Sequence, residues 1–318
     1  MMMETSLKPG KHFRRGMPKP CLALVFSGGG ARGAMQVGAV RALLEAGVKP
    51  DLLVGTSIGA ANATGLALWG VDPAGIDVLE RAWQDAAGAC LMDPRLSRLF
   101  LRRMLGRPST HGSQQIARFL TSKGITSDLR FDQMTGVRLA LVGADLVSGQ
   151  PVIYGQDPSQ SVLEGVLAST AVPPWFAPVE KDGQYIIDGG VLSNLPIEPA
   201  LTMGATEIIA LDLGDGDSTG EKNSNVLVDY VDKLSLAIMR RQIALETALA
   251  KAHGVPVYRI QLTSPIPTPI WAFNNYPQLI AAGYEMTQQQ ISSWDRDNCS
   301  IPSRRRLQTI PFSLSESM

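Results

Sequence analysis

Histidine, cysteine and net charge are all in short supply in this chain of 318 residues. It contains three histidines and three cysteines, and its 29 Lys and Arg residues balance its 29 Asp and Glu residues. A chain without net charge gives no electrostatic reason to expect a nucleic-acid partner. Cys21, Cys90 and Cys299 share no spacing typical of a disulfide framework or a metal site. We therefore expect a reducing compartment, such as the cytoplasm, and no bound metal.

A clear targeting or membrane-spanning segment is also lacking. Residues 1–20 are basic and contain proline but no apolar core, so they are interpreted as a flexible leader rather than a signal peptide. Residues 52–71 carry no charge, yet their glycines and polar residues favour a buried strand and helix over a bilayer span. The hydrophobic content of 45% is ample for a large core. We predict one domain over residues 21–298, followed by a tail over residues 299–318.

The segment Gly55-Thr-Ser-Ile-Gly59 is the strongest catalytic motif. It follows the apolar run Leu52–Val54 and leads into a helix from about Ile58, which predicts a tight strand-to-helix turn with Ser57 at its tip. The two glycines allow the strained backbone and the close packing of strand on helix that this turn needs. The helix N-terminus favours negative charge beside the serine. Ser57 is therefore the candidate nucleophile.

A glycine cluster precedes this motif in a similar strand–loop–helix setting. Leu22–Phe26 is predicted to be a buried strand, and a helical pattern covers residues 34–46. Between them Gly28, Gly30 and Gly33 match G-x-G-x-x-G, which is also a dinucleotide-binding pattern. That pattern expects an acidic residue after the next strand, where this chain has Gly-Thr-Ser. The alternative is that the loop amides bind an oxyanion. The residues expected to do so are Gly28, Gly29, Gly30 and Ala31.

A third motif ends another predicted strand. Tyr185–Ile187 is apolar and is followed by Asp188-Gly189-Gly190. By itself Asp-Gly commonly marks a simple turn. Together with the other two motifs it makes Asp188 the candidate general base, because the two glycines allow its backbone to approach the serine loop closely.

The rest of the chain continues the alternation of strands and helices. Further strands are expected over Val137–Asp145, Gln150–Tyr154, Glu207–Leu213 and Val255–Leu262, with a short helix over Ser161–Ser169. This order predicts an α/β fold, a three-layer α/β/α sandwich with a mainly parallel central sheet. The carboxyl ends of adjacent parallel strands share one edge of a sheet, so the glycine loop and the serine turn are expected to meet.

The three motifs in this order resemble those of the patatin-like phospholipases and lipid acyl hydrolases, in particular their compact bacterial branch. The resemblance covers residues 22–213 most clearly. The segments that carry it are Ser27–Gly33, Gly55–Gly59 and Asp188–Gly190, with Ala168–Pro178 and Val191–Pro196 beside them. The supporting motif residues are Arg32, Gly33, Gly55, Gly59, Gly189 and Gly190.

This resemblance implies a patatin-like fold and a Ser57–Asp188 catalytic dyad. It implies a phospholipid, a lysophospholipid or another fatty acyl ester as substrate, and no cofactor. Because a free Asp has a pKa near 4, the dyad needs a low-water pocket that makes Asp188 more basic. Asp188 would take the Ser57 proton during attack on the ester, and water would later release the acyl group.

The scarcity of histidine bears on the competing triad. His12 lies in the leader and His111 in a Pro-Ser-Thr-His-Gly-Ser segment that is expected to be a loop. His253 follows Ser57 and Asp188 in the order of an α/β-hydrolase triad. It stands at the end of a long predicted helix, however, where an imidazole is a common capping feature. The Ser–Asp–His arrangement remains an alternative.

Two further alternatives share the fold. One is an acyltransferase that passes the acyl group from Ser57 to a thiol or alcohol, and the other is a non-catalytic protein that binds fatty acid. Arg32 has two interpretations as well. Its guanidinium either faces a substrate phosphate or the oxyanion, or pairs with an acidic residue under the loop, and the structural role is the more usual for a buried arginine.

Two segments are candidates for contact with lipid. Pro94–Arg107 has the pattern of a basic amphipathic helix, which can rest on an anionic membrane surface or be an ordinary solvated helix. Val226–His253 is a second helix with an apolar stripe, a pattern most often found in a core. That stripe consists of Leu227, Val231, Leu234 and Ile238. Either helix, or the cluster Trp271–Phe273–Tyr276, is a candidate wall for an acyl channel, and peripheral membrane contact is expected.

Overall fold

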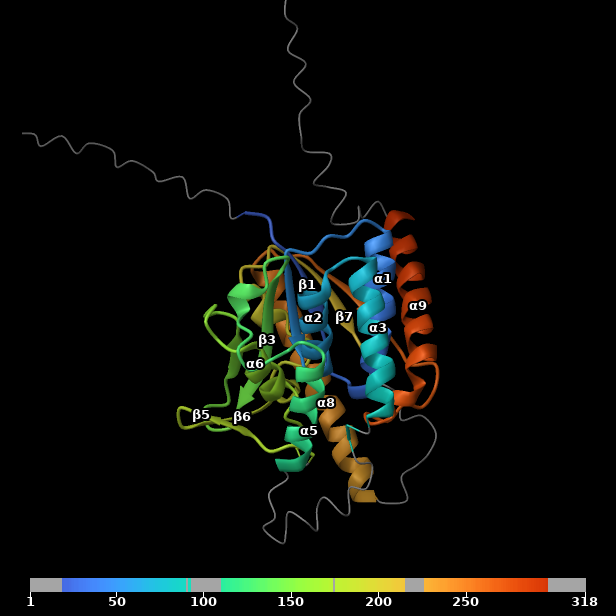
Figure 1. The fold of residues 1–318 in the computed structure, drawn as a ribbon. Helices are drawn as coiled ribbons and strands as arrows, with labels where there is room; N and C mark the ends of the chain where they lie inside the picture. The colour runs from blue at the N-terminus through green and yellow to red at the C-terminus, as the bar shows by residue number, and fades with distance from the viewer. Residues whose placement is uncertain (1–18, 90, 93–109, 174, 215–225, 297–318) are drawn as a thin grey trace, which may run out of the picture.

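The computed structural model describes residues 19–89, 91–92, 110–173, 175–214 and 226–296. An eight-stranded sheet lies at the centre of this part of the chain (Figure 1). The strands are β1 (Leu22–Phe26), β2 (Leu52–Thr56), β3 (Arg138–Asp145), β4 (Pro151–Tyr154), β5 (Val179–Lys181), β6 (Gln184–Asp188), β7 (Glu207–Asp212) and β8 (Val257–Gln261). The helices are α1 (Ala34–Glu45), α2 (Ile58–Trp69), α3 (Pro73–Gly88), α5 (Thr110–Ser122), α6 (Val162–Ser169), α7 (Ile197–Thr202), α8 (Val226–Ala252) and α9 (Tyr276–Arg296).

The sheet is parallel at its centre and antiparallel at one side. Its order is β5-β6-β3-β2-β1-β7-β8, and β4 also pairs with β3. The five strands β1, β2, β3, β7 and β8 run parallel to their neighbours among themselves, whereas β4, β5 and β6 pair antiparallel. The prediction of a mainly parallel sheet is confirmed. Helices connect the parallel strands, as crossovers between such strands require.

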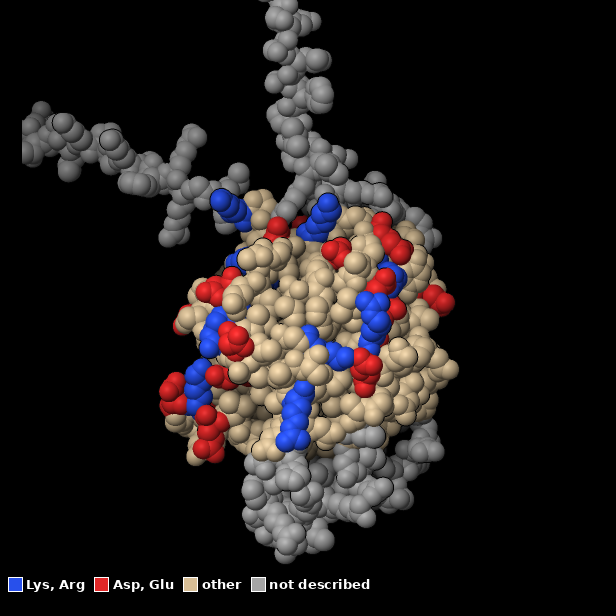
Figure 2. Space-filling view, in the orientation of Figure 1, with Lys and Arg blue, Asp and Glu red and all other residues tan. Residues whose placement is uncertain are grey.

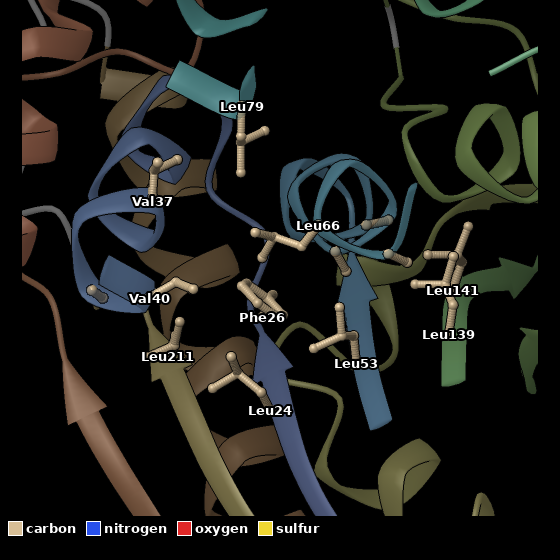
Figure 3. Close-up of a cluster of buried hydrophobic side chains, with 14 of the residues drawn as sticks. Leu24, Phe26, Val37, Val40, Leu53, Leu66, Leu79, Leu139, Leu141 and Leu211 are labelled. Carbon is tan, nitrogen blue, oxygen red and sulfur yellow. The ribbon is translucent and has the colours of Figure 1, made fainter. Parts of the chain in front are cut away.

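Side chains of the central strands alternate between two cores. Leu24 and Phe26 of β1 belong to a large core under α1, α2, α3 and α9, whereas Ala23 and Val25 face α7 and α8. Figure 3 shows the first of these cores, with Leu24 and Leu53 of the sheet directed toward the helix layer. Full burial of a leucine side chain stabilises a fold by about 1.5–3 kcal/mol. The chain therefore forms the predicted three-layer α/β/α sandwich.

The predicted strands are all present, with their ends shifted by up to two residues. The three-residue strand β5 was not predicted, since the sequence Val-Glu-Lys has no distinct strand pattern. The prediction of a loop around His111 was wrong, because α5 begins at Thr110. Thr and Ser occur in loops and at helix starts alike, so their presence does not distinguish the two.

Helix α8 is present where it was predicted, but part of its stripe is not core. The side chains of Leu234 and Ile238 are each 49% exposed, and Tyr230 is 64% exposed. Positions spaced by four residues share one helix face, so these three form an exposed apolar stripe. Helical spacing shows which residues share a face and not what covers it. The side chains of Leu227 and Val231, and the whole of Pro94–Arg107, lie outside the described residues.

The described helices give no sign of a membrane span. None of those in the described ranges is both long and apolar enough to cross a bilayer. The uncharged stretch 52–71 is β2 followed by α2, as predicted. On the face drawn in Figure 2, Lys and Arg are interspersed with Asp and Glu, so the balanced charge of the chain is also spread in space on that face.

Candidate active site

Ser57 forms the strained turn that its motif predicts. It stands between β2 and α2 with φ 57° and ψ −125°, a left-handed conformation that is rare outside glycine and costs about 1–3 kcal/mol. A Cβ at Gly55 would lie 2.4 Å from the carbonyl oxygen of Gly59, and one at Gly59 would lie 2.4 Å from the carbonyl oxygen of Phe26. Both motif glycines are therefore required by close backbone packing around the serine.

Strand β3 brings Ser57 and Asp188 together. Its residues Leu141 and Val142 pair with both β2 and β4, so these two strands lie on opposite edges of β3. Gly143 and Ala144 pair with both β4 and β6, which places β6 on the same edge as β2. Because β2 runs parallel to β3 and β6 runs antiparallel, the two strands meet end to end at their carboxyl ends. Ser57 directly follows the carboxyl end of β2, and Asp188 is the last residue of β6.

The end of α6 holds both catalytic candidates by hydrogen bonds. Ser57 N donates to Ser169 Oγ at 2.9 Å, and that hydroxyl donates to the carbonyl of Val142 at 2.6 Å. Two residues later, the carbonyl of Ala171 accepts from Asp188 N at 3.2 Å. The fully buried Ser169 thus fixes the amide of the nucleophile while its own segment fixes the acid.

Asp188 is a buried carboxyl with one uncommitted oxygen. Its Oδ1 accepts from the amide of Gly190 at 2.8 Å, while Oδ2 is buried and has no hydrogen-bond partner among the described residues. Burial raises the pKa of Asp188 to about 6, although the neighbouring Ser57 side chain and the Gly190 amide act to lower it. The Ser57 hydroxyl therefore lies near the carboxyl without a hydrogen bond of ordinary length. Such contacts are often loose before substrate binds.

Two of the four amides of the glycine loop after β1 already donate hydrogen bonds to main-chain carbonyls. The Gly28 amide donates to the carbonyl of Asn194 at 3.0 Å, and the Ala31 amide donates to the carbonyl of Ile270 at 2.9 Å. Within the described ranges, no residue accepts a hydrogen bond from the amide of Gly29 or Gly30. These two amides are thus the ones left to bind an oxyanion.

Buried polar side chains hold this loop in place. Gln36 donates to the carbonyl of Ser27 at 2.9 Å and accepts from Asn62, which in turn accepts from the indole of Trp83. Arg32 donates to the carbonyls of Gly29 and Gly214, so it ties the loop to the chain after β7. These contacts match the structural interpretation of Arg32, with carbonyl oxygens as its partners here.

A large apolar cavity opens beside these groups. Its volume is about 580 Å³, and its wall includes Gly29, Gly30, Ser57 and Asp188. Pockets of this size hold drug-sized ligands. Most of the remaining wall is aliphatic or aromatic and includes Ile58, Trp69, Leu79, Trp83, Leu120, Ile125, Val166, Phe176, Ile238, Met239 and Phe273. Phe273 and three residues of α8, namely Ser235, Ile238 and Met239, are in the wall, whereas Trp271 and Tyr276 are not among the lining residues.

His253 lies near the start of β8, at the end of the sheet where the parallel strands begin and opposite the end that carries Ser57. It follows α8, which crosses about 40 Å from the carboxyl ends of the strands to the start of β8. Val257 of β8 pairs with Ile208 near the start of β7, whereas Ser57 follows the end of β2. The fold therefore separates His253 from the predicted site. Within the described ranges, no group of three or more His, Cys, Asp and Glu residues is placed to hold a metal ion.

Sequence reasoning missed three polar residues that shape the site. Ser169 and Asn194 lie in segments that resemble the family, but neither was singled out, and Gln36 was hidden in a helix pattern. Each is nearly or fully buried. A polar residue within an otherwise apolar stretch was the available signal, although it does not reveal the partner.

Comparison with known proteins agrees with this geometry. A family model described as patatin-like phospholipase matches residues 24–201, more than half of the chain. Patatin-like phospholipase domain-containing protein 7 of Mus musculus is 33% identical over 214 residues, which are 67% of this chain and 15% of that protein. Patatin-like phospholipase domain-containing protein 6 of Homo sapiens is 28% identical over 295 residues, 87% of this chain and 21% of that protein.

A search of solved structures also gives matches. The crystal structure of VipD from Legionella pneumophila matches with a TM-score of 0.42 and 16% identity, over 86% of this chain and 67% of that one. The chain spans about a fifth or less of the length of the two curated relatives. With the motifs, the fold and the family match in agreement, the chain belongs to the patatin-like phospholipase family.

Proposed function

We propose that the protein is a serine lipid acyl hydrolase that cleaves fatty acyl esters with a Ser57–Asp188 dyad. The observation that carries this proposal is the end-to-end meeting of β2 and β6, which puts a strained serine beside a buried carboxyl with an uncommitted oxygen. Both residues line one apolar cavity. Phospholipase A, lysophospholipase and carboxylesterase activities are each the cleavage of an acyl ester, so all three fall within this proposal.

In the proposed mechanism Asp188 Oδ2 accepts the proton of Ser57 Oγ as that oxygen attacks the ester carbonyl. The amides of Gly29 and Gly30 bind the oxyanion of the tetrahedral intermediate. Asp188 then donates its proton to the departing alcohol oxygen, and the C–O bond breaks to leave an acyl-enzyme on Ser57. A water molecule gives its proton to Asp188 and attacks the acyl-enzyme, which releases the fatty acid and restores the hydroxyl of Ser57.

The surroundings of Asp188 support a dyad over a triad. A base works best when its pKa lies near the working pH, and burial moves the pKa of Asp188 to about 6. The alternative triad needs His253, which the fold holds at the opposite end of the sheet. Most residues of the cavity wall are apolar, although Lys123 and Ser235 also line it, which suits a site that takes a fatty acyl chain.

A lipid-release assay tests the proposed function. Incubation of the full chain with phospholipids and lysophospholipids should release free fatty acids, detected by mass spectrometry. A fluorophosphonate probe should label Ser57, because activated serines react rapidly with it. Ser57→Ala should abolish both results, whereas Ser159→Ala, at an exposed serine in a turn, should change neither. Fatty-acid release by Ser57→Ala at a rate near that of the native chain would overturn the assignment.

Contact with a lipid surface is part of this proposal. The exposed stripe on α8 consists of Tyr230, Leu234 and Ile238, and Ile238 also lines the cavity. An apolar stripe that continues into the wall of the cavity gives a lipid in a bilayer a path to Ser57. Exposed apolar side chains on a helix can bury themselves at the boundary of headgroups and acyl chains.

Liposome flotation tests this contact. The native chain should float with phosphatidylcholine vesicles, and Tyr230→Ser/Leu234→Ser should lower the bound fraction several-fold. Leu245→Ser is the matched control, since Leu245 is 51% exposed on the same helix but lies toward the opposite end of it from Tyr230 and Leu234. Absence of flotation with either zwitterionic or anionic vesicles would exclude the contact.

A further inference from the structure

Asn194 lies between the glycine loop and the Asp188 turn. A Cβ on Gly28 would be 2.6 Å from Asn194 Oδ1 and 3.1 Å from Ser57 Cβ, and a Cβ on Gly190 would be 3.0 Å from the same Oδ1. The carboxamide of Asn194 therefore packs against both glycines without room for a side chain on either. It is a neighbour of the nucleophile, the acid and the oxyanion-binding loop at once.

The main chain around Asn194 is fixed from both sides. The carbonyl of Asn194 accepts from the Gly28 amide at 3.0 Å, and the carbonyl of Ser193 accepts from the Thr56 hydroxyl at 2.9 Å. Thr56 directly precedes the nucleophile. The backbone that carries the Asn194 side chain is thus bonded both to the loop and to the end of β2, so the carboxamide is held rigidly relative to Ser57.

The side chain of Asn194 is buried but has no hydrogen bond to any described residue. It is 6% exposed and lines the cavity. Another buried amide in the cavity wall, Asn62, contrasts with it. Asn62 donates to the carbonyl of Gly33 and to Gln36 and accepts from Trp83, which employs both ends of its carboxamide. Neither Oδ1 nor Nδ2 of Asn194 is among the fully buried polar atoms of the described residues that lack a partner, so the carboxamide is open to the cavity, where a bound substrate can reach it.

The two ends of this carboxamide differ in their surroundings. Oδ1 is the end that lies against the backbones of Gly28 and Gly190, where Cα–H groups are weak donors to an oxygen. The Nδ2 end then remains for the cavity, whose wall also includes Gly29, Gly30 and Ser57.

We propose that Asn194 is a third donor to the oxyanion, with Nδ2 hydrogen-bonded to the former carbonyl oxygen of the ester in the tetrahedral intermediate. This assignment rests on the proposed serine hydrolase mechanism and adds a catalytic residue to it. A preorganised side-chain amide stabilises the negative charge that develops in the transition state more than the neutral carbonyl of the bound ester. Its loss therefore lowers kcat and leaves KM nearly unchanged.

Kinetics of Asn194→Ala and Asn194→Asp test the assignment. Asn194→Asp has the same shape but cannot donate when ionised, so it serves where the smaller side chain impairs folding. Both variants should lose about 10²–10³-fold in kcat, with KM within about threefold of the native value. The rate of labelling by a fluorophosphonate should fall in parallel, because its phosphoryl oxygen occupies the place of the oxyanion.

Thermal unfolding separates a catalytic from a structural amide. Asn62→Ala should lower Tm by several degrees, since it removes three buried hydrogen bonds, whereas Asn194→Ala should shift Tm far less. A folded Asn194→Ala that retains kcat within about threefold overturns the assignment while the serine mechanism stands. If the native chain itself neither hydrolyses esters nor reacts with the probe, the proposed function falls, and the role of Asn194 falls with it.

Discussion

Two buried carboxyl groups, those of Asp188 and Glu246, differ in what surrounds them. Asp188 and Glu246 are each only 6% exposed. Burial raises the pKa of Asp188 to about 6 and that of Glu246 to about 7. Asp188 keeps Oδ2 without a partner beside Ser57. Glu246, on α8, accepts from the amide of Glu198 at 2.8 Å at the start of α7 and is absent from the cavity wall.

This difference shows that a raised pKa alone does not mark a catalytic base. Perturbed groups cluster at active sites, but buried structural carboxyls are perturbed as well. A base also needs a free oxygen, a proton donor within reach and access for substrate. Asp188 has all three, whereas Glu246 has a raised pKa and bonds to main-chain amides. The proposed catalytic role therefore belongs to Asp188, whereas Glu246 supports the contact between α7 and α8.

The largest expected difference comes from replacing each of the two carboxyls separately by the corresponding amide. Asp188→Asn should lower kcat for ester hydrolysis by about 10²–10⁴-fold, the usual contribution of general-base catalysis. Glu246→Gln should keep kcat within about threefold, since Gln can still accept from the Glu198 amide. The measurement is the steady-state rate on one soluble ester for both variants. Similar losses in the two would abolish the distinction between them.

The sequence allowed a prediction for only one of these two carboxyls. Asp188 could be found because it ends an apolar strand and precedes two glycines, and the resemblance to a family gave it a role. Glu246 sits within a long helix among exposed charges, where nothing in the pattern indicates burial. Its environment depends on the packing of α8 against α7, a contact between segments about fifty residues apart in the chain.

Other features of the fold also divide into those that a local sequence pattern predicts and those that depend on contacts between distant segments. The central strands and the serine turn follow from local apolar runs and glycines, so their prediction succeeded. The meeting of β2 and β6 on one edge of β3 depends on register among three strands, which no single segment encodes. Ser169, which bonds the amide of Ser57, could not be assigned for that reason.

The pH dependence of hydrolysis gives a second, smaller difference. The base form of Asp188 is required, and its pKa is about 6. The value of kcat/KM should therefore be level above about pH 7 and fall about tenfold per pH unit well below pH 6. Glu246→Gln should show the same profile as the native chain. A profile that shifts in this variant would mean that Glu246 also controls the reaction.

The smallest effect concerns stability and is followed in Glu246→Gln, whose activity should stay near that of the native chain. Glu246 has a pKa of about 7 when folded, above the ordinary value of 4.5. Its protonated form is thus favoured in the folded state, so the stability it contributes is full below about pH 4.5 and is lost as pH rises through 7. Gln carries no such loss. The free energy of unfolding of the variant, relative to the native chain, should rise by at most about 3 kcal/mol between pH 4.5 and pH 8.

Urea unfolding at several pH values measures this difference, with Glu180→Gln as the control at an exposed carboxylate of β5. The control shows how the loss of an exposed carboxylate alone changes the free energy of unfolding across this pH range. A level difference for Glu246→Gln would show that its carboxyl is not destabilised by burial. A rising difference at unchanged kcat would instead show that burial of this carboxyl lowers stability without serving catalysis. Burial of Asp188 lowers stability in the same way, but there it makes the base that Ser57 requires.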